Sequence, residues 1–269
     1  MRGLVLDFDG VIFDSAPEAY LVARSTYAEI GPARPAASRL PAAPDLPATT
    51  RDDVLGDRLY QGFVDLMPLG NRAEDYAVIL SILERGVRVD DQAAYSQERA
   101  RISQDFQDAF HARFYEVRSG FQQDAPERWR ALQGPYPELV TLLRRRASSV
   151  ALAIATAKDR ASVRLLLEDH GLGDLFPDAR LMDKEAGRSK TAHLRHLQAA
   201  LGIPFPELTF VDDKVNHLDA VATLGVRCVL AGWGYNGTRE HELARQRGYA
   251  VCPLDAAEGQ LFGGKPGAA

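Results

Sequence analysis

The stretch Leu4–Val11 constrains the fold of this chain more than any other. Leu4–Leu6 is an apolar run too short for a helix, and Gly10 follows closely, so we predict a short buried strand. Asp7 and Asp9 come next, and in an extended backbone residues two apart point to the same side. Two carboxylates this close repel each other. A divalent cation with oxygen ligands would offset the repulsion, and a polar turn after an edge strand is the alternative.

Length and composition are typical of a globular protein. The 269 residues suffice for one large domain or for a core with a second small domain, and 46% are apolar. The net charge of −5 predicts no general nucleic-acid binding, and no apolar run is long enough to span a membrane. The first strand begins within a few residues of Met1, which leaves no room for a signal peptide. Cys228 and Cys252 lie in apolar stretches, so we expect reduced thiols and a cytoplasmic protein.

A helix follows the first strand. Pro17 suits the first turn of a helix that Ser15 or Asp14 would cap, and residues 18–30 continue it. Residues 31–50 then contain five prolines among many alanines. This composition indicates a loop or an extended linker rather than a packed element.

Helical spacing returns over residues 51–121 and includes one long run over 91–117. Aromatic residues recur at helical intervals in this region, which is typical of a core. We find no convincing strand here. The pattern therefore predicts an all-helical unit over residues 16–134.

Strands and helices alternate again from Pro135. The predicted strands are short apolar runs at residues 150–155, 179–182, 208–211, 226–230 and 249–252. The predicted helices lie at residues 137–147, 160–170, 190–201 and 218–224. Such alternation favours a parallel sheet covered by helices. We expect the Gly-rich segment beyond Asp255 to be flexible.

Three apolar strands each end in polar residues. Asp7 and Asp9 follow the first strand, Thr156 follows the strand over 150–155, and Asp212 and Asp213 follow the strand over 208–211. Ligand sites of open parallel sheets lie at the carboxyl ends of the strands. The coincidence therefore predicts one shared site.

These residues resemble the haloacid dehalogenase superfamily of hydrolases, in particular the phosphoglycolate phosphatase-like type with a helical cap inserted after the first strand. The first motif is Asp7-Phe8-Asp9-Gly10-Val11-Ile12-Phe13-Asp14-Ser15, and the fourth is Phe210-Val211-Asp212-Asp213. The second motif is Thr156, and the third is a lysine before the strand of the fourth. The resemblance covers roughly residues 1–15 and 135–235.

The resemblance implies an α/β fold with a Rossmann-like parallel sheet core and an inserted all-helical cap domain. The catalytic core would comprise residues 1–15 and 135–254, and the cap residues 16–134. Residues 255–269 would form a flexible tail. The cap matches relatives in position and helicity, not in detail.

The resemblance also assigns roles to the motif residues. Asp7 would be the nucleophile that forms an aspartyl-phosphate, and Asp9 would protonate the leaving group and later activate water. Dehalogenating relatives lack an acid at the position of Asp9, which favours phosphoryl chemistry. Thr156, with Ala157 beside it, and the third-motif lysine would bind the phosphate. The implied cofactor is Mg²⁺, bridging Asp7, the carbonyl oxygen of Asp9 and an acid of the fourth motif.

The two acids of the fourth motif leave the direct metal ligand open. Relatives with two adjacent acids generally use the second as ligand, so we assign Asp213 to the metal and Asp212 beside it. Relatives often carry an acid or an asparagine four residues after the ligand. That position holds His217 when counted from the second acid and Asn216 when counted from the first.

The third-motif lysine is Lys190 or Lys184. Lys190 opens the helix before the fourth-motif strand, where relatives usually place this residue, so we prefer it as the catalytic and substrate-binding lysine. Relatives often follow the lysine with a proline, whereas Thr191 follows here. A solvated helix end is the alternative for either lysine.

Other candidate residues are weaker. His193 and His196 lie three residues apart on a predicted helix, but no third ligand has a suitable spacing, so we do not expect zinc. Lys158 either contacts substrate or belongs to a surface loop. The loop over residues 232–237 either borders the site or is a plain turn.

We therefore predict a magnesium-dependent phosphatase that acts on a small phosphorylated metabolite. A phosphosugar mutase of the same fold is the alternative enzyme. A non-catalytic relative that binds a partner through its cap is the third possibility, and the retention of Asp7 and Asp9 argues against it. In the cap, Arg113 and Arg118 either meet an anionic substrate or are solvated. We expect no nucleic-acid or membrane partner, and either a monomer or a homodimer.

Overall fold

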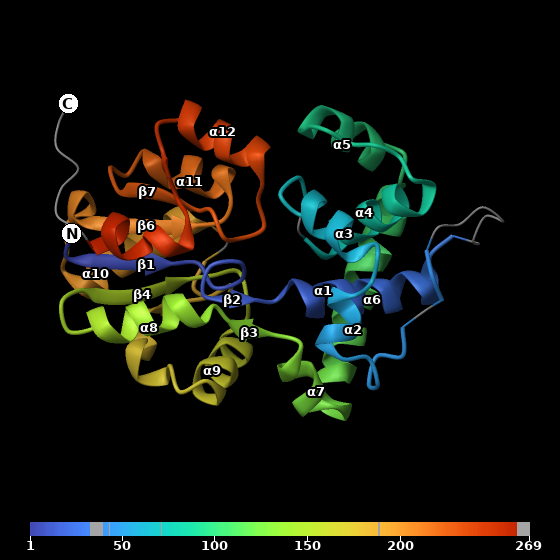
Figure 1. The fold of residues 1–269 in the computed structure, drawn as a ribbon, viewed down its shortest axis with the longest axis horizontal. Coiled ribbons are helices and arrows are strands. Elements are labelled where there is room, and N and C mark those ends of the chain that lie inside the picture. The colour runs from blue at the N-terminus through green and yellow to red at the C-terminus, as the bar shows by residue number, and fades with distance from the viewer. Residues whose placement is uncertain (33–39, 43, 71, 188, 263–269) are drawn as a thin grey trace. The chain divides into compact units, whose positions relative to one another are not determined.

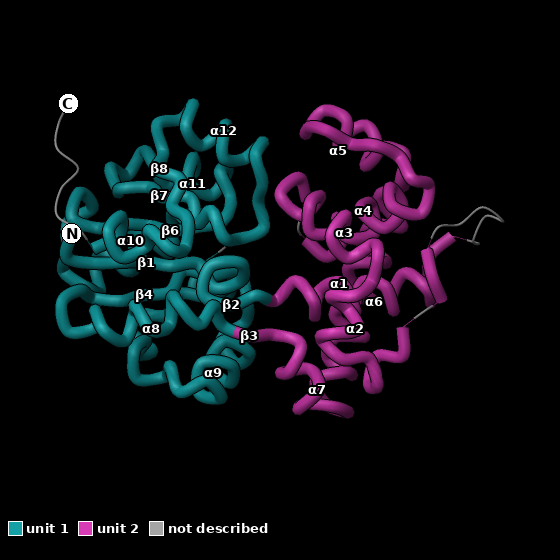
Figure 2. Tube along the Cα trace, viewed as in Figure 1, with its two compact units in different colours: residues 1–14, 135–269 teal, residues 15–134 magenta. Residues whose placement is uncertain are grey.

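The computed structural model describes residues 1–32, 40–42, 44–70, 72–187 and 189–262. The chain divides into two compact units (Figure 2). Unit 1 comprises residues 1–14 and 135–269, and unit 2 comprises residues 15–134. For comparison, the sequence predicts a helical cap over residues 16–134.

Unit 1 is built on a six-stranded sheet in which neighbouring strands are parallel (Figure 1). The strand order is β5-β4-β1-β6-β7-β8. The bounds are β1 (Gly3–Leu6), β4 (Ala151–Ala155), β5 (Leu181–Met182), β6 (Leu208–Asp212), β7 (Arg227–Ala231) and β8 (Ala250–Cys252). β1 is buried along its whole length, and Leu6 lies opposite both Ile154 of β4 and Val211 of β6. The predicted α/β class with a Rossmann-like parallel sheet is confirmed.

The helices of unit 1 follow the strands in alternation. Their bounds are α8 (Pro137–Arg146), α9 (Arg160–Asp169), α10 (Lys190–Leu201), α11 (Val215–Ala222) and α12 (Thr238–Gln246). Leu194 of α10 and Leu218 of α11 pack in one apolar cluster with Phe210 of β6. α10 has the predicted bounds, because the Ser189 side chain caps its start and Gly202, with φ of 63°, ends it. We did not predict α12, whose buried face is too small to give a clear apolar period.

A second, two-stranded sheet lies where the chain leaves and re-enters unit 1. It pairs β2 (Phe13–Asp14) with β3 (Gly134–Pro135). The N–H of Tyr136 extends the pairing by donating to the carbonyl oxygen of Ile12 at 3.0 Å. Strands of two residues are too short to leave a period in the sequence, so we did not predict them.

Unit 2 is helical in its described residues. Its helices are α1 (Ala16–Ile30), α2 (Arg51–Leu55), α3 (Tyr60–Leu66), α4 (Ala73–Arg85), α5 (Gln92–Ala100), α6 (Gln104–Asp124) and α7 (Pro126–Ala131). Aromatic rings form much of its core. Tyr20 of α1 meets Tyr60 and Phe63 of α3 edge-on, and Phe63 contacts Tyr76 of α4. These side chains are buried, which confirms the core role predicted from their spacing.

Two helix boundaries differ from the sequence prediction. The run predicted over residues 91–117 is two helices, because the Ser103 side chain accepts a hydrogen bond from the N–H of Phe106 and starts α6 afresh. The apolar spacing continues across this break and conceals it. α1 begins at Ala16, and the Ser15 side chain makes no capping hydrogen bond there. Asp14, the other predicted cap, belongs to β2.

The predicted proline-rich linker is packed at one place. Residues 33–39 and 43 of this linker lie outside the described residues. Leu40 is buried, and the carbonyl oxygens of Pro41 and Ala42 accept hydrogen bonds from the buried Arg24 guanidinium at 3.1 and 2.9 Å. The segment 40–42 is therefore fixed to α1 rather than extended away from it.

The first part of the predicted flexible tail is packed. Residues 254–256 and 258–262 form short helical turns. Ala257, between the two turns, and Leu261 are buried. Glu258 pairs with Arg145 and Arg146 at 2.5 and 2.6 Å. The expectation is wrong for residues 255–262 because these side chains pack on unit 1. Residues 263–269 of the predicted tail lie outside the described residues.

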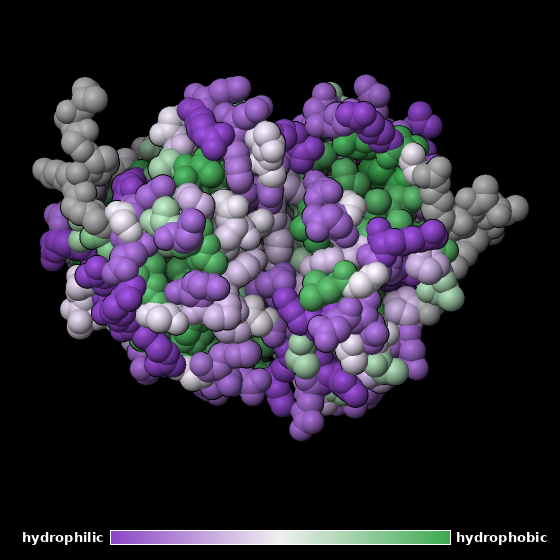
Figure 3. All heavy atoms as spheres, in the orientation of Figure 1, coloured by the Kyte–Doolittle hydropathy of each residue, from purple (hydrophilic) through white to green (hydrophobic). Residues whose placement is uncertain are grey.

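The face of the molecule in Figure 3 is mainly hydrophilic, with smaller apolar areas between charged side chains. Among the described helices, none is both long and apolar enough to cross a membrane.

Candidate active site

Polar side chains gather at the carboxyl ends of three neighbouring strands. Asp7 follows β1, Thr156 follows β4, and Asp212 ends β6 just before Asp213. β4, β1 and β6 are adjacent and parallel, so their carboxyl ends lie at the same edge of the sheet. All four side chains are buried. The strand order thus brings these predicted site residues together.

Lys190 connects the three strand ends. Its Nζ lies 2.8 Å from Oδ2 of Asp7 and 3.2 Å from Oδ2 of Asp212. The same ammonium donates a hydrogen bond to the carbonyl oxygen of Ala155, at the end of β4, at 2.7 Å. Lys190 is buried as the first residue of α10, whereas Lys184 is exposed. The geometry therefore favours Lys190 over Lys184 at this site.

Burial and charge together set the ionisation of this cluster. Burial raises the pKa of Asp7; Lys190 opposes this effect and Asp212 adds to it. Burial also acts to raise the pKa of Asp212, but His217 and Lys190 outweigh it and hold that pKa below its usual range. Burial acts to lower the pKa of Lys190, but Asp212 and Asp7 keep it raised. Lys190 and Asp212 are thus an ion pair, and a further cation would favour the ionised form of Asp7.

The loop after β1 is tightly folded. The carbonyl oxygen of Phe8 accepts hydrogen bonds from the N–H groups of Ile12 and Phe13, both at 2.9 Å, and the Phe8 and Phe13 rings stack with centroids 4.6 Å apart. Gly10 has φ of 78°, and a Cβ there would lie 2.6 Å from Oδ2 of Asp213. This position therefore requires glycine, and the Asp213 carboxylate lies against the loop.

Asp9 pairs with Lys158, which follows β4. Oδ1 of Asp9 lies 2.9 Å from Nζ of Lys158, whose side chain is buried. The backbone N–H of Lys158 donates to Oγ1 of Thr156 at 3.1 Å, which leaves the Thr156 hydroxyl able to donate to another acceptor. Ala157 lies between them and is exposed. Of the two interpretations of Lys158, the structure rules out a solvated surface loop.

Asp213 has the carboxylate that fits a cation best. Its Oδ2 accepts a hydrogen bond from the N–H of Tyr235 at 3.1 Å, whereas Oδ1 has no hydrogen-bond partner among the described residues. Burial raises the pKa of Asp213 well above its usual range; Lys214 opposes this, and Asp212 and Asp7 add to it. A buried carboxylate oxygen without a partner is costly, and Mg²⁺ takes oxygen ligands. The buried Asp213 carboxylate is therefore a suitable ligand for Mg²⁺.

Both carboxylate oxygens of Asp212 instead contact other groups of the protein. Nδ1 of His217 lies 3.1 Å from both of its carboxylate oxygens, and the N–H of Lys214 donates to Oδ1 at 3.0 Å. Ligand atoms of Asp7, Asp212 and His217 also lie within 4.8 Å of one another, a spacing that a metal ion could use. Because both oxygens of Asp212 already have partners, the geometry favours Asp213 as the direct ligand and Asp212 as its support.

The two histidines of α10 lie in different environments. His193 is buried, and its Nε2 lies 2.8 Å from the carbonyl oxygen of Gly187. His196 is exposed. Neither belongs to a group of three metal-ligating side chains within the part of the chain that the structure describes.

The two cap arginines form ion pairs within unit 2. Arg118 pairs with the buried Glu18 at 2.8 Å, and Arg113 pairs with Glu29 at 2.6 Å and with Glu116 at 2.9 Å. They are structural ion pairs, so the structure does not support their suggested contact with an anionic substrate.

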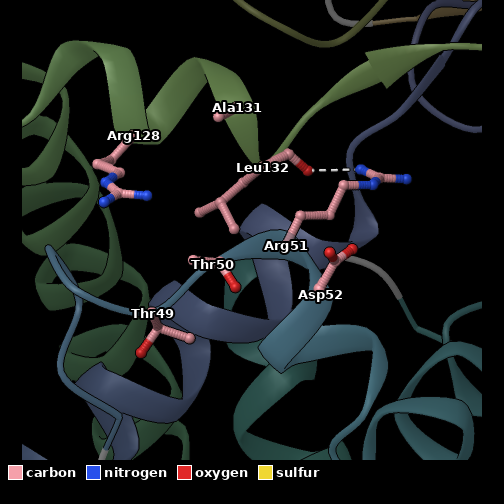
Figure 4. A pocket seen from close by; sticks show the side chains of 7 residues that line it. All are labelled: Thr49, Thr50, Arg51, Asp52, Arg128, Ala131 and Leu132. Carbon is pink, nitrogen blue, oxygen red and sulfur yellow. Dashed lines mark hydrogen bonds between the residues drawn. The ribbon is translucent and has the colours of Figure 1, made fainter.

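Unit 2 also contains a small open cavity of about 220 Å³ between the start of α2 and the end of α7 (Figure 4). Its lining residues are Thr49, Thr50, Arg51, Asp52, Arg128, Ala131 and Leu132. Arg51 spans it by donating to the carbonyl oxygen of Leu132 at 2.7 Å. None of the predicted site residues lines this cavity.

Two features of the site escaped the sequence analysis. The partner of Asp9 was not identified, although the scarcity of lysine in this chain makes Lys158 conspicuous. The loop after β7 was predicted either to border the site or to be a plain turn, but its contacts with Asp213 were not identified. Both features are contacts between segments far apart in the sequence, and no local pattern reports them.

Part of this sequence matches known proteins. The family model for haloacid dehalogenase-like hydrolases matches residues 1–225. The tyrosine-protein kinase PtkA of Mycobacterium tuberculosis is 35% identical over 92 residues, which are 34% of this chain and 31% of PtkA. The chain thus spans about a third of the length of the curated relatives that it matches.

Solved structures share the fold over almost the whole chain. A haloacid dehalogenase-like family hydrolase from Streptococcus pneumoniae has a TM-score of 0.64 at 13% identity and covers 97% of this chain and 98% of its own. A predicted phosphoglycolate phosphatase from Haemophilus somnus has a TM-score of 0.59 at 17% identity, with 95% and 96% covered.

Proposed function

The chain belongs to the family of haloacid dehalogenase-like hydrolases, and we propose that it is a magnesium-dependent phosphatase of a small phosphomonoester. The observation that carries the proposal is the ion-paired set of Asp7, Lys190 and Asp212 at three adjacent strand ends. A buried carboxylate beside a fixed ammonium suits attack on a phosphoryl group, because the ammonium offsets charge on the incoming anion.

Asp7 is the proposed nucleophile. One of its oxygens forms a bond to phosphorus while the bond from phosphorus to the substrate oxygen breaks, which gives an aspartyl-phosphate and an alkoxide. Asp9, two residues later, gives a proton to this alkoxide. It then takes a proton from water as the water oxygen attacks phosphorus, releasing inorganic phosphate and restoring Asp7. Proton transfer of this kind contributes about 10²–10⁴-fold to rate.

Thr156 and Lys190 are the proposed phosphate ligands. The Thr156 hydroxyl can donate to a phosphoryl oxygen, because its Oγ1 accepts only the N–H of Lys158 from the described residues. Lys190 is charged and held in place by three partners, so it loses little freedom when an anion binds. We include Ala157, exposed beside Thr156, in the phosphate-binding loop.

We propose that Mg²⁺ is held by Asp7, the carbonyl oxygen of Asp9 and Asp213, with Asp212 in support. Oδ1 of Asp213, which has no hydrogen-bond partner among the described residues, supports this choice of ligand. Bound there, the cation would neutralise charge on the phosphate and on the acid cluster. Lys158, Lys190 and His217 contact Asp9, Asp7 and Asp212, and the cation would add positive charge beside Asp213.

A panel of phosphomonoesters tests the proposal. The full-length protein should release inorganic phosphate from at least one of them at a steady rate, lose this activity in excess chelator and regain it with added Mg²⁺. The Asp7→Asn variant, prepared in the same way, controls for contaminating phosphatases. Release that is equal in the two proteins, or absent across the panel, would contradict the proposed function.

Phosphoryl transfer to an acceptor other than water is a second candidate. A phosphosugar mutase would use the same aspartyl-phosphate, and the partial match to a protein named a tyrosine kinase makes transfer to tyrosine worth testing. Labelled donors distinguish transfer from hydrolysis. A labelled sugar bisphosphate tests transfer to a sugar phosphate, and labelled ATP tests transfer to tyrosine. Label that appears in a sugar phosphate or on tyrosine faster than in inorganic phosphate would favour transfer over hydrolysis.

A further inference from the structure

The loop after β7 makes hydrogen bonds to Asp213, which lies in the turn directly after β6 (the Asp213 turn). We call residues Trp233–Gly237 the clamp loop. Within it, the N–H of Tyr235 donates to Oδ2 of Asp213 at 3.1 Å, and Nδ2 of Asn236 donates to the carbonyl oxygen of Asp213 at 3.0 Å. Asp213 is thus held at its side chain and at its backbone by two consecutive residues of another segment.

Close packing confines Asp213 from the same side. A Cβ on Gly234 would lie 2.4 Å from Cβ of Asp213 and 2.5 Å from the carbonyl oxygen of Gly10. The clamp loop, the Asp213 turn and the loop after β1 therefore meet without space for a side chain. Trp233 anchors the loop after β1, because its Nε1 donates to the carbonyl oxygen of Val11 at 2.9 Å.

Asn236 joins the ends of two neighbouring strands. Its Nδ2 donates to Ala231, the last residue of β7, at 2.9 Å as well as to Asp213, which follows β6. Two carbonyl acceptors require the NH₂ group, so the orientation of the amide is determined by its partners. The amide oxygen then accepts from Nε2 of His241 on α12 at 2.7 Å, which fixes the amide from the other side.

We propose that Asn236 is a positioning residue for the cation site. By holding the backbone of Asp213 while the Tyr235 N–H takes Oδ2, it leaves Oδ1 as the oxygen available to the cation. His241 supports the amide, and the clamp loop thereby sets the Mg²⁺ affinity of the site. This inference rests on the proposed function, because it assumes that Asp213 binds the cation.

The arrangement has a measurable consequence. Groups that orient a metal ligand typically change metal affinity by about 10–100-fold when they are removed. Asn236→Ala removes both amide donors and leaves the Tyr235 N–H in place, so Asp213 keeps its side-chain bond but loses its backbone anchor. His241→Ala leaves the amide donors and removes only their support, so its effect should be smaller.

Direct Mg²⁺ binding to the full-length protein without substrate tests the proposal by isothermal titration calorimetry, with Mn²⁺ binding by electron paramagnetic resonance as a second probe. We expect the dissociation constant to rise about 10–100-fold in Asn236→Ala and less in His241→Ala. Tyr249→Phe is the matched control, because it removes a hydrogen bond to Asp219 in unit 1 that does not involve Asp213. Its affinity should equal that of the unmutated protein.

The outcomes separate this inference from the proposed function. Unchanged cation affinity in a folded Asn236→Ala protein would overturn the inference alone, and so would an equal loss in Tyr249→Phe. If Asn236→Ala does not fold, unchanged affinity in His241→Ala would overturn it. An unmutated protein that binds neither cation would overturn both the inference and the magnesium dependence proposed above.

Discussion

The ammonium of Lys190, the first residue of α10, lies 2.8 Å from Oδ2 of Asp7, which directly follows β1. Both groups are buried, and each opposes the effect of burial on the pKa of the other. The same ammonium reaches Asp212 at the end of β6. A single cation thus connects the proposed nucleophile with the strand that carries the proposed metal ligand.

Replacing the proposed nucleophile should remove turnover and preserve the fold. In Asp7→Asn, Lys190 keeps Asp212 and the Ala155 carbonyl as partners, so we expect a melting temperature close to that of the unmutated protein. Phosphate release should fall at least about 10³-fold, the scale seen when a catalytic nucleophile is lost. Phosphate release and thermal unfolding measure the two effects. Near-normal turnover in this variant would contradict the mechanism.

Neutralising Asp213 should mainly weaken Mg²⁺ binding, whereas neutralising Asp212 should mainly lower stability. Asp213→Asn should weaken Mg²⁺ binding by more than about 100-fold, whereas Asp212→Asn should weaken it less. Asp212→Asn should lower the melting temperature more, because it leaves His217 without its carboxylate and removes one of the two carboxylates that pair with Lys190. Calorimetric titration and thermal unfolding of both variants measure these effects. The reverse order of Mg²⁺ affinities would make Asp212 the direct ligand.

For Asp213→Asn without cation, we expect higher stability at neutral pH than in the unmutated protein. The raised pKa of Asp213 means that its ionised form disfavours folding once the pH is above the ordinary aspartate value of 3.8. The gain should disappear at pH 3, where the group is protonated in the folded and the unfolded chain. A loss of stability at pH 7 in chelator would contradict this sign.

The two candidate lysines of the third motif should differ sharply. Lys190→Met leaves two buried carboxylates without their shared cation, which typically costs about 3–5 kcal/mol, and it should abolish phosphate release. Lys184→Met is the control, because Lys184 is exposed and its loss should change stability by less than about 0.5 kcal/mol. Denaturant unfolding and phosphate release measure both. Equal effects of the two substitutions would contradict the assignment of Lys190.

His193 should make the protein acid-sensitive. Burial lowers its pKa below the ordinary 6.5, and although the Gly187 carbonyl opposes this, Lys190 adds to the lowering. The unfolded chain therefore binds a proton near pH 6.5 before the folded one does, and stability falls as the pH drops below that value. In His193→Gln, the fall in melting temperature between pH 7.5 and 5.5 should be smaller than in the unmutated protein. An equal fall would exclude this contribution.

Removing only the arginine of the Arg118–Glu18 pair should destabilise unit 2 more than removing both charges. Glu18 also accepts a hydrogen bond from Nε1 of Trp129 at 2.9 Å. Arg118→Leu leaves the buried carboxylate without its cation, so we expect a loss of about 3–5 kcal/mol in the free energy of unfolding. Adding Glu18→Gln removes the charge and should restore part of it. Arg113→Leu, which breaks a half-exposed pair, is the control, with an expected loss below about 1 kcal/mol.

The sequence by itself determined the class of fold and predicted which polar residues follow the strand ends. Apolar runs bounded by Gly and polar residues located the long strands, because a strand buried on both faces must be apolar throughout. The strand-end positions of Asp7, Thr156 and Asp212 then predicted a shared site, because parallel strands present their carboxyl ends at one edge. Helix α10 was predicted to the residue, because both of its caps are local signals.

Only the tertiary structure decided how those residues pair. It placed Lys158 on Asp9, His217 on Asp212 and the clamp loop on Asp213. Oδ1 of Asp213 has no hydrogen-bond partner in the part of the chain that the structure describes. The tertiary structure also formed β2 and β3 from segments too short to show a period, and ordered residues 255–262 on unit 1. These outcomes depend on contacts between distant segments, whose geometry is fixed by packing and charge in three dimensions and leaves no periodic trace in the chain.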